Sequence, residues 1–278
     1  MSSNMVRRVA FAAVAIPVAL GAVWLGGWAL AGTVAVLGAL GAREVYDLAR
    51  RAGVEALRPI GLLGAAAIPL VTLGAPDQGL ILGVVWLLAV PALAMARGPG
   101  ARPLAAVSVT VFGALYASGS LAFLLLLREA PHGPSDPLAR TALVALPLVL
   151  TWLCDTAAMT VGRAWGGARM APVLSPNKTW SGGVGGAVTA AAAAVVLGLF
   201  GLNRLGWSFT VVQLLGVGLV VGVLGQLGDV AESLFKREVG VKDSSDLLPG
   251  HGGIIDRLDS LYYVIPATAA LYRVYGVL

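Results

Sequence analysis

Apolar runs, each close to the roughly 20 residues that a helix needs to cross a bilayer, recur about nine times along this chain. Hydrophobic residues make up 58% of its 278 residues and charged residues only 12%. That is too little polar surface to cover a soluble globule of this size. The runs do not alternate as the strands of a membrane barrel do. The sequence therefore predicts an all-α polytopic transmembrane protein with about nine membrane helices.

The expected helices cover residues 9–25, 27–42, 59–74, 79–96, 104–127, 138–162, 183–201, 208–230 and 256–276. Arg7 and Arg8 precede the first run, as in a cleaved secretory signal. The apolar character nevertheless continues to about Leu40, which favours two membrane helices. No soluble domain or internal repeat is visible. We therefore predict one integral membrane domain with an N-terminal half, 1–138, and a C-terminal half, 139–278.

The distribution of basic residues predicts the orientation. With these spans, every Lys and Arg falls on one side except Arg128, Arg140, Arg204 and Arg273. Cytoplasmic loops are enriched in Lys and Arg, so the N-terminus and the long polar loops are expected in the cytoplasm. The net charge of +5 then reflects topology and a phosphate-rich surface, and we expect no nucleic-acid partner. Residues 42–51 fit an amphipathic helix end at this surface, and we interpret its arginines as topology determinants.

Two acidic residues stand beside apolar runs in the C-terminal half. Asp155 follows ALVALPLVLTWLC, and Asp229 ends VVGVLGQLG. A carboxylate in or next to a membrane helix is costly unless it is paired or binds a metal ion. Both are therefore candidate functional residues, and the alternative is a hydrogen bond that packs one helix against another.

Two pairs of glycines have a spacing of four, Gly182 with Gly186 and Gly218 with Gly222. Small residues at this spacing let membrane helices approach closely. We therefore interpret both pairs as helix-packing positions. The first pair also opens a helix, so its N–H groups are a weaker candidate for a phosphate site.

The most polar segment follows Asp229. If residues 229–237 continue a membrane helix, Asp229, Ser233 and Lys236 share one face, at spacings of four and three. That face offers a carboxylate, a hydroxyl and a cation to one phosphate. A solvated helix end would use the same residue types, so the downstream residues decide between the two interpretations.

Residues 249–253 form a glycine-rich turn, which we expect to expose N–H groups to a ligand. Asp256 and Asp259 follow at i and i+3, on one face of a new helix. With Asp229 they make an oxygen-rich cradle for Mg²⁺, which takes one or two carboxylates and completes its shell with phosphate and water. A second cation stays open. His251 either contacts phosphate, carries a proton or fixes the turn.

A second polar loop, residues 162–183, lies on the same predicted side of the membrane. Its candidate phosphate-binding residues are Arg163, Arg169, Ser175, Asn177, Lys178 and Thr179. The loop lacks the GxxxxGK[ST] pattern, which argues against a P-loop NTPase. The two polar loops together are expected to form a cytoplasmic active site.

A long pattern of polar and glycine residues links these loops to a known family. In the C-terminal segment it comprises Ser233, Lys236, Arg237, Lys242, Asp243, Ser245, Leu248, Pro249, His251, Gly252, Gly253, Asp256, Arg257 and Asp259. Upstream it comprises Asp155, Thr156, Ala158, Gly162, Arg163, Ser175, Pro176, Lys178, Thr179 and Gly182. The chain thereby resembles the phosphatidate cytidylyltransferase, or CDP-diacylglycerol synthase, family over its C-terminal half. It departs from the family pattern at Met159 and Thr160, where an aromatic pair is usual, and at Ser181, where Glu is common.

The resemblance implies an enzyme of phospholipid biosynthesis that transfers CMP from CTP to phosphatidic acid, giving CDP-diacylglycerol and pyrophosphate. It also implies Mg²⁺ dependence, a homodimer and a bacterial-type inner membrane with the active site facing the cytoplasm. Expected catalytic residues are Asp229, Lys236, Asp243, His251, Asp256 and Arg257. Expected substrate-binding residues are Asp155, Arg163, Ser175, Asn177, Lys178, Thr179, Ser233, Arg237 and Lys242. Expected metal ligands are Asp229, Asp256 and Asp259.

Two other classes of protein fit part of this pattern. A CTP-dependent lipid-alcohol kinase would share the membrane setting and the nucleotide, but it would transfer the γ-phosphate and release CDP. A membrane transporter would also carry intramembrane Asp residues and small-residue helix contacts. Transporters more often show paired interrupted helices or inverted repeats, which are not visible here.

Overall fold

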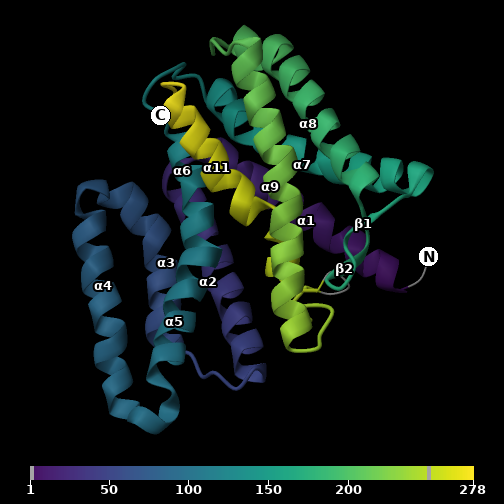
Figure 1. The fold of residues 1–278 in the computed structure, drawn as a ribbon. Helices are drawn as coiled ribbons and strands as arrows, with labels where there is room; N and C mark the ends of the chain where they lie inside the picture. The colour runs from purple at the N-terminus through teal and green to yellow at the C-terminus, as the bar shows by residue number, and fades with distance from the viewer. Residues whose placement is uncertain (1–2, 249–251) are drawn as a thin grey trace. The chain divides into compact units, whose positions relative to one another are not determined.

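A computed structural model describes residues 3–248 and 252–278 of the chain, and these residues are mostly helical (Figure 1). The α-helices are α1 (Ser3–Leu25), α2 (Gly27–Arg51), α3 (Arg58–Gly74), α4 (Gly79–Ala94), α5 (Pro103–Ala114), α6 (Ser120–Arg128), α7 (Pro137–Trp165), α8 (Trp180–Phe200), α9 (Val211–Glu238), α10 (Ile255–Leu258) and α11 (Leu261–Val274). A π-helical turn, Leu115–Gly119, joins α5 to α6. Strands β1 (Arg169–Ala171) and β2 (Ser175–Thr179) form an antiparallel pair.

Six helical segments of the described residues are long and apolar enough to cross a membrane. They are Gly27–Arg51, Pro76–Arg97, Pro103–Arg128, Pro137–Trp165, Trp180–Leu205 and Val211–Glu238. Two shorter apolar helices are Ala13–Leu25 and Arg58–Gly74. The predicted polytopic helical membrane protein is thus confirmed in its class, while the number of nine spans stays a prediction.

The structure corrects two local predictions. The loop at 162–183 contains the β1–β2 hairpin, which the apolar pattern did not predict. The helix expected from residue 256 is divided, because α10 ends at Leu258 and α11 begins at Leu261. At the break, a carboxylate oxygen of Asp259 accepts the N–H of Ser260 at 2.6 Å, a local bond that competes with helix continuation. Asp256 and Asp259 therefore do not share the face of one helix.

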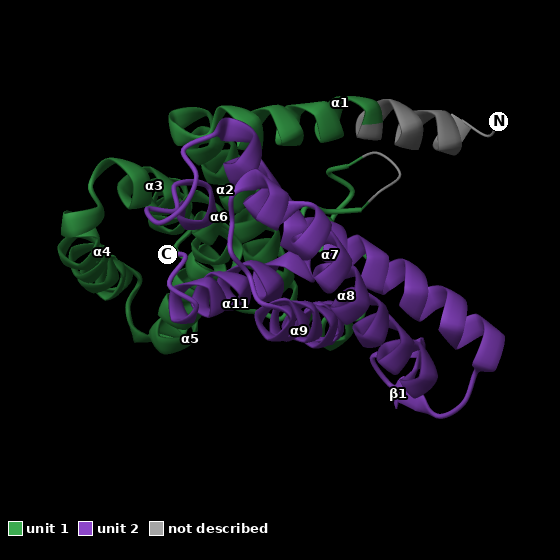
Figure 2. Cartoon of the chain, turned by 90° about the horizontal axis from the view of Figure 1, so that it is seen from above, with its two compact units in different colours: residues 1–125, 235–258 green, residues 126–234, 259–278 purple. Residues whose placement is uncertain are grey.

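The chain forms two compact units, coloured separately in Figure 2. Unit 1 contains Met1–Leu125 and Phe235–Leu258, and unit 2 contains Leu126–Leu234 and Asp259–Leu278. Each unit thus combines two segments that are far apart in the sequence. The predicted halves, 1–138 and 139–278, describe where the polar motifs lie along the sequence and stay a prediction.

Unit 1 packs α2, α3 and α5 around the buried side chain of Tyr46. The Tyr46 hydroxyl donates to the carbonyl of Thr110 at 2.8 Å, and the hydroxyl of Thr110 accepts the N–H of Leu57 at 2.8 Å. A Cβ atom at Gly61 or Gly113 would collide with the Tyr46 ring. These contacts fix the second half of α2 within its unit.

Unit 2 packs α7, α8 and α9 through glycines. A Cβ atom at Gly182 or Gly186 would meet backbone carbonyl oxygens of α7 at 2.5 and 2.9 Å. A Cβ atom at Gly218 or Gly222 would meet Cα atoms of α8 at 2.5 and 2.7 Å. Real Cβ atoms do not approach so closely, so the backbones touch because side chains are absent. The predicted helix-packing role of both pairs is confirmed.

Candidate functional site

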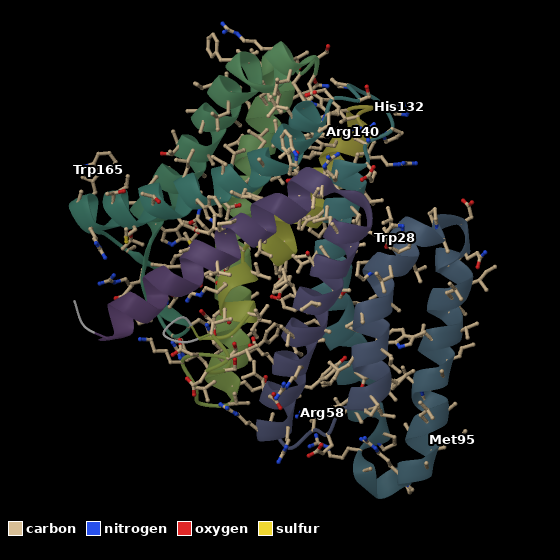
Figure 3. All side chains as sticks on the ribbon, turned by 180° about the vertical axis from the view of Figure 1, so that it is seen from behind. Trp28, Arg58, Met95, His132, Arg140 and Trp165 are labelled. Carbon is tan, nitrogen blue, oxygen red and sulfur yellow. The ribbon has the colours of Figure 1, made fainter. Side chains whose placement is uncertain are left out.

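A pocket of about 860 Å³ opens in unit 2, within the range of small-molecule sites. Its polar lining includes Asp155 and Arg163 from α7, Asn177 and Lys178 from β2, and Asp229 from α9. Three of these residues come from the polar loop at 162–183, and the other two are the acidic positions singled out in the sequence. Trp165, which is labelled in Figure 3, is the last residue of α7. The structure thus brings together predicted residues that lie up to 74 positions apart, from residue 155 to residue 229.

Lys178 is the cation that contacts the acidic part of this pocket directly. Its ammonium nitrogen lies 2.6 Å from a carboxylate oxygen of Asp229 and 3.4 Å from the carbonyl oxygen of Gln226. The carboxylate of Asp155 is repelled by Asp229 and attracted by Lys178. The pocket therefore presents two acidic groups that share one cation, with Arg163 as a further cation on its wall.

The hairpin positions Lys178 by pairing two short strands and leading directly into α8. Arg169 pairs with Thr179, and Thr179 is the N-cap of α8, where its hydroxyl accepts the N–H of Gly182 at 3.2 Å. This bond satisfies one of the free N–H groups at the helix start. Thr179 is 5% exposed and also lines the pocket. The N–H of Gly182, a candidate for phosphate binding, is already used by that cap.

The residues that depart from the family pattern lie at this pocket or beside it. Met159 lines the pocket. The hydroxyl of Thr160 donates to the carbonyl of Thr156 in the preceding turn of α7. The hydroxyl of Ser181 lies 3.1 Å from that of Thr179 and donates to the carbonyl of Gly166. Ser181 thus ties the end of α7 to the start of α8.

A second polar cluster lies in unit 1, around Asp256. One carboxylate oxygen of Asp256 accepts from the ammonium group of Lys236 at 2.7 Å. The other accepts from the N–H of Ser244 at 2.9 Å, the hydroxyl of Ser244 at 2.8 Å and the N–H of Gly253 at 2.7 Å. The Asp256 side chain is 3% exposed. Lys236 and Asp256, both predicted as catalytic, therefore form a buried and fully hydrogen-bonded ion pair.

Glu44 of α2 belongs to the same cluster, and the sequence analysis did not select it. One carboxylate oxygen accepts from the hydroxyl of Ser245 at 2.6 Å and the N–H of Ile254 at 2.9 Å. The other accepts from the hydroxyl of Ser244 and the N–H of Ile255, both at 3.0 Å. Glu44 is 2% exposed. Its signal in the sequence is its place at the end of an apolar run, the criterion that selected Asp155 and Asp229.

The glycine-rich turn is partly as predicted. Gly252 has a φ of +80°, a backbone conformation that favours glycine. A Cβ atom at Gly253 would collide with the hydroxyl of Ser244 and the carboxylate of Glu44. The expected exposure of N–H groups to a ligand is wrong for Gly253, because its N–H donates to Asp256. His251, with Pro249, lies outside the described residues.

The remaining predicted residues are distributed over both units. In unit 1, Arg237 donates to the carbonyl of Val241 at 2.7 Å. Exposed residues of unit 1 that were predicted to act in catalysis or binding are Lys242, Asp243 and Arg257. In unit 2, Ser233 is buried beside the fully buried Glu232, and Ser175 in β2 does not line the pocket.

The predicted metal ligands are divided between the units, with Asp229 and Asp259 in unit 2 and Asp256 in unit 1. Across residues 3–248 and 252–278, no group of three or more His, Cys, Asp or Glu side chains is arranged to hold a metal ion. The predicted set of three ligands therefore stays a prediction. The pair of acidic residues that the structure does bring to one pocket is Asp155 and Asp229.

Comparisons with known proteins agree with this arrangement. The model of the cytidylyltransferase family matches residues 6–275. A phosphatidate cytidylyltransferase of Brucella suis biovar 1 is 42% identical over 164 residues, 59% of this chain and 55% of the relative. Proteins of the same name from Haemophilus influenzae and Staphylococcus aureus are 39% identical over 141 residues and 45% identical over 118 residues. These matches cover 51% and 42% of this chain, and 49% and 44% of the relatives. The chain thus spans about half the length of the curated relatives it matches.

Proposed function

Because the chain belongs to the cytidylyltransferase family, we propose that it transfers CMP from CTP to phosphatidic acid, forming CDP-diacylglycerol and releasing pyrophosphate. The observation that carries the proposal is the unit 2 pocket, in which Asp155, Asp229, Lys178 and Arg163 meet. Relatives at 39–45% identity bear the name of this activity. Family membership favours transfer of CMP over the kinase and transporter alternatives.

The pocket has the chemistry that two phosphate-bearing substrates require. Arg163, Arg169 and Lys178 supply cations to its lining, and cationic groups form strong hydrogen bonds with phosphate oxygens. Its volume of about 860 Å³ is large enough for a nucleotide. The pocket is lined by the C-terminal part of α7, by β2 and by Gln226 and Asp229 within α9. In the proposed reaction, the nucleotide enters this pocket from water, while the acyl chains of the lipid stay in the bilayer.

In the proposed reaction, an oxygen of the lipid phosphate attacks the α-phosphorus of CTP. The new bond joins the lipid phosphate to CMP, and the bond between the α-phosphorus and the bridging oxygen to the β-phosphate breaks. Pyrophosphate leaves with the electron pair of that bond. The attacking phosphate is already ionised, so no strong general base is needed. Lys178, Arg163 and Arg169 would stabilise the negative charge that develops on the phosphates.

We also propose Mg²⁺ as the cofactor, and the pocket residues fit it. Asp155 and Asp229 face one pocket and repel each other, and Lys178 forms an ion pair with Asp229. Mg²⁺ typically binds one or two carboxylates together with substrate phosphate, and it would neutralise charge on the triphosphate. Participation of Asp259 and Asp256 stays a prediction. For Asp256, a metal ion would have to bind beside donors that are already in place, three at one carboxylate oxygen and Lys236 at the other.

The site is proposed to face the cytoplasm from a bacterial inner membrane. The support is the bias of Lys and Arg toward the side that carries the polar loops. A homodimer is expected from the family resemblance only.

The test is a reconstitution of the reaction with detergent-purified protein, CTP, phosphatidic acid and Mg²⁺, leaving out each component in turn. We expect pyrophosphate and CDP-diacylglycerol in equal amounts, and only with all three components present. Release of CDP instead of pyrophosphate would identify a kinase. No product from a folded, lipid-supplemented protein would overturn the proposed reaction.

A further inference from the structure

We infer that Glu44 is a positioning residue of the proposed reaction, one that sets the Lys236–Asp256 pair in place through the loop between α9 and α10. The inference rests on the proposed function and on the prediction from the sequence that Lys236 binds a substrate phosphate. Glu44 itself is buried in unit 1, and its donors among the described residues lie in this loop and at the start of α10.

Glu44 joins the two limbs of this loop to helix α2. The donors on the first limb are the hydroxyls of Ser244 and Ser245, and those on the second are the N–H groups of Ile254 and Ile255. A carboxylate has about four acceptor positions, and four donors face the two oxygens of Glu44, one of them the hydroxyl of Ser244 that Glu44 shares with Asp256. Hydrogen bonds to a charged acceptor are about twice as strong as neutral ones. A single buried charge therefore orders both limbs.

The connection from Glu44 to the ion pair passes through one hydroxyl. The oxygen of Ser244 lies 3.0 Å from Glu44 and 2.8 Å from Asp256. A hydroxyl has one hydrogen, so it donates to only one carboxylate at a time. The N–H of Ser244 also donates to Asp256. The position of Ser244 thus fixes Asp256, and Asp256 holds the ammonium group of Lys236 at 2.7 Å.

The charge of Glu44 matters more than its shape. In Glu44→Gln, the side-chain amide has the same size, but its NH₂ group would face either Ser245 and Ile254 or Ser244 and Ile255. The N–H of Ile254 or of Ile255, which can only donate, would then oppose the NH₂ group in a buried place, which is costly. Glu44→Asp keeps the charge and only shortens the side chain. We therefore expect Gln to release the loop and Asp to preserve part of its order.

The experiment compares Glu44→Gln and Glu44→Asp with Glu55→Gln, which removes an exposed carboxylate of the same unit. Hydrogen exchange of peptides covering residues 239–248 and 252–258 is the first readout. We expect faster exchange in Glu44→Gln, an intermediate rate in Glu44→Asp and the wild-type rate in Glu55→Gln. This readout does not depend on the reaction, so it still tests the inference if the wild-type protein makes no CDP-diacylglycerol.

Kinetics provide the second readout and separate positioning from loss of folded protein. Displacing Lys236 should raise the KM of the substrate whose phosphate it binds, CTP or phosphatidic acid, by roughly three- to tenfold in Glu44→Gln. Loss of folded protein would lower the apparent kcat and leave both KM values unchanged. Partial recovery in Glu44→Asp is expected. Unchanged exchange, or unchanged KM values in Glu44→Gln, would overturn the inference.

Ser244→Ala keeps the test decisive if Glu44→Gln does not accumulate as folded protein. It removes only the shared hydroxyl and leaves the two N–H bonds to Glu44 in place. The same rise in KM is expected, with a thermal midpoint close to that of the wild type. Wild-type KM values in Ser244→Ala would overturn the inference.

Discussion

The unit 2 pocket and the unit 1 cluster are built from similar residue types, but their carboxylates differ in exposure and in the number of hydrogen-bond donors around them. In the pocket, the Asp229 side chain is 39% exposed and forms an ion pair with Lys178. In the cluster, Asp256 is 3% exposed, and its two oxygens accept from four donors. Both residues are aspartates, so the difference lies in the donors around them. The carboxylate of Asp229 is open to ligands, whereas the donors around Asp256 make it a group that organises a loop.

The largest effect is expected from Asp229→Asn. The substitution removes a negative charge from the unit 2 pocket, where ligands can reach it. Turnover should therefore fall by at least about 1000-fold, equivalent to several kcal/mol of transition-state stabilisation. Thermal stability should change little, because the side chain is partly exposed. CDP-diacylglycerol formation and the thermal midpoint measure the two effects. Glu129→Gln, an exposed carboxylate change in the same unit, is the matched control.

Near-normal activity in Asp229→Asn would show that the carboxylate of Asp229 has no essential role in the proposed reaction.

Asp256→Asn should reduce both activity and stability, which would separate it from Asp229→Asn. Breaking a buried ion pair typically costs about 3–5 kcal/mol, because the remaining charge loses its partner. Here Lys236 is the residue left without its carboxylate. Urea or thermal unfolding of the purified variant measures the loss. A variant that is inactive but as stable as the wild type would show that Asp256 acts directly on a ligand and does not mainly organise the loop.

Gly253→Ala is expected to have a smaller effect of the same kind. Its Cβ atom would push against the hydroxyl of Ser244 and the carboxylate of Glu44, and overpacking of this sort costs about 1–3 kcal/mol. Gly83→Ala in α4 is the control, since a Cβ atom there would meet nothing within 4 Å. Thermal midpoints and hydrogen exchange of the loop compare the two variants. Equal stability of both would contradict the tight cluster.

Ser181→Glu should have the smallest effect, within about threefold of the wild-type rate, because the single hydroxyl it removes bonds locally to Thr179 and Gly166. The comparison is steady-state activity at saturating CTP. A large gain in rate would show that the Glu common in the family contributes to the reaction and that Ser181 is a functional departure. A large loss would place the hydroxyl among the groups that shape the pocket.

Site residues that are far apart in the sequence could be predicted only where the neighbouring residues of each one made it stand out. Asp155 and Asp229 were found because a carboxylate beside an apolar run is costly, and the structure brings both to one pocket. Glu44 carries the same signal, but its partners lie 200 to 211 residues away. No local pattern in a single sequence reveals such a pairing.

The helices were predictable, and the short elements were not. Apolar length alone predicts the membrane helices, since a bilayer requires about 20 residues. The three-residue strand β1 depends on pairing with β2, so its own sequence contains too little information. The break between α10 and α11 depends on one bond, from the N–H of Ser260 to Asp259. Prediction from sequence patterns fails for such short elements, because a pairing partner or a single hydrogen bond decides their structure.

The glycine contacts of unit 2 also set the width of its pocket. Asp155 lies on α7 and Asp229 on α9, and α8 packs against both helices through Gly186 and Gly218. A methyl group at either glycine would have to push two backbones apart, and the helices would carry their carboxylates with them. The separation of two ligand-binding groups is thus determined by atoms that are missing from residues outside the pocket. A complete substitution scan would therefore find Gly186 and Gly218 as intolerant as the residues that touch the substrates.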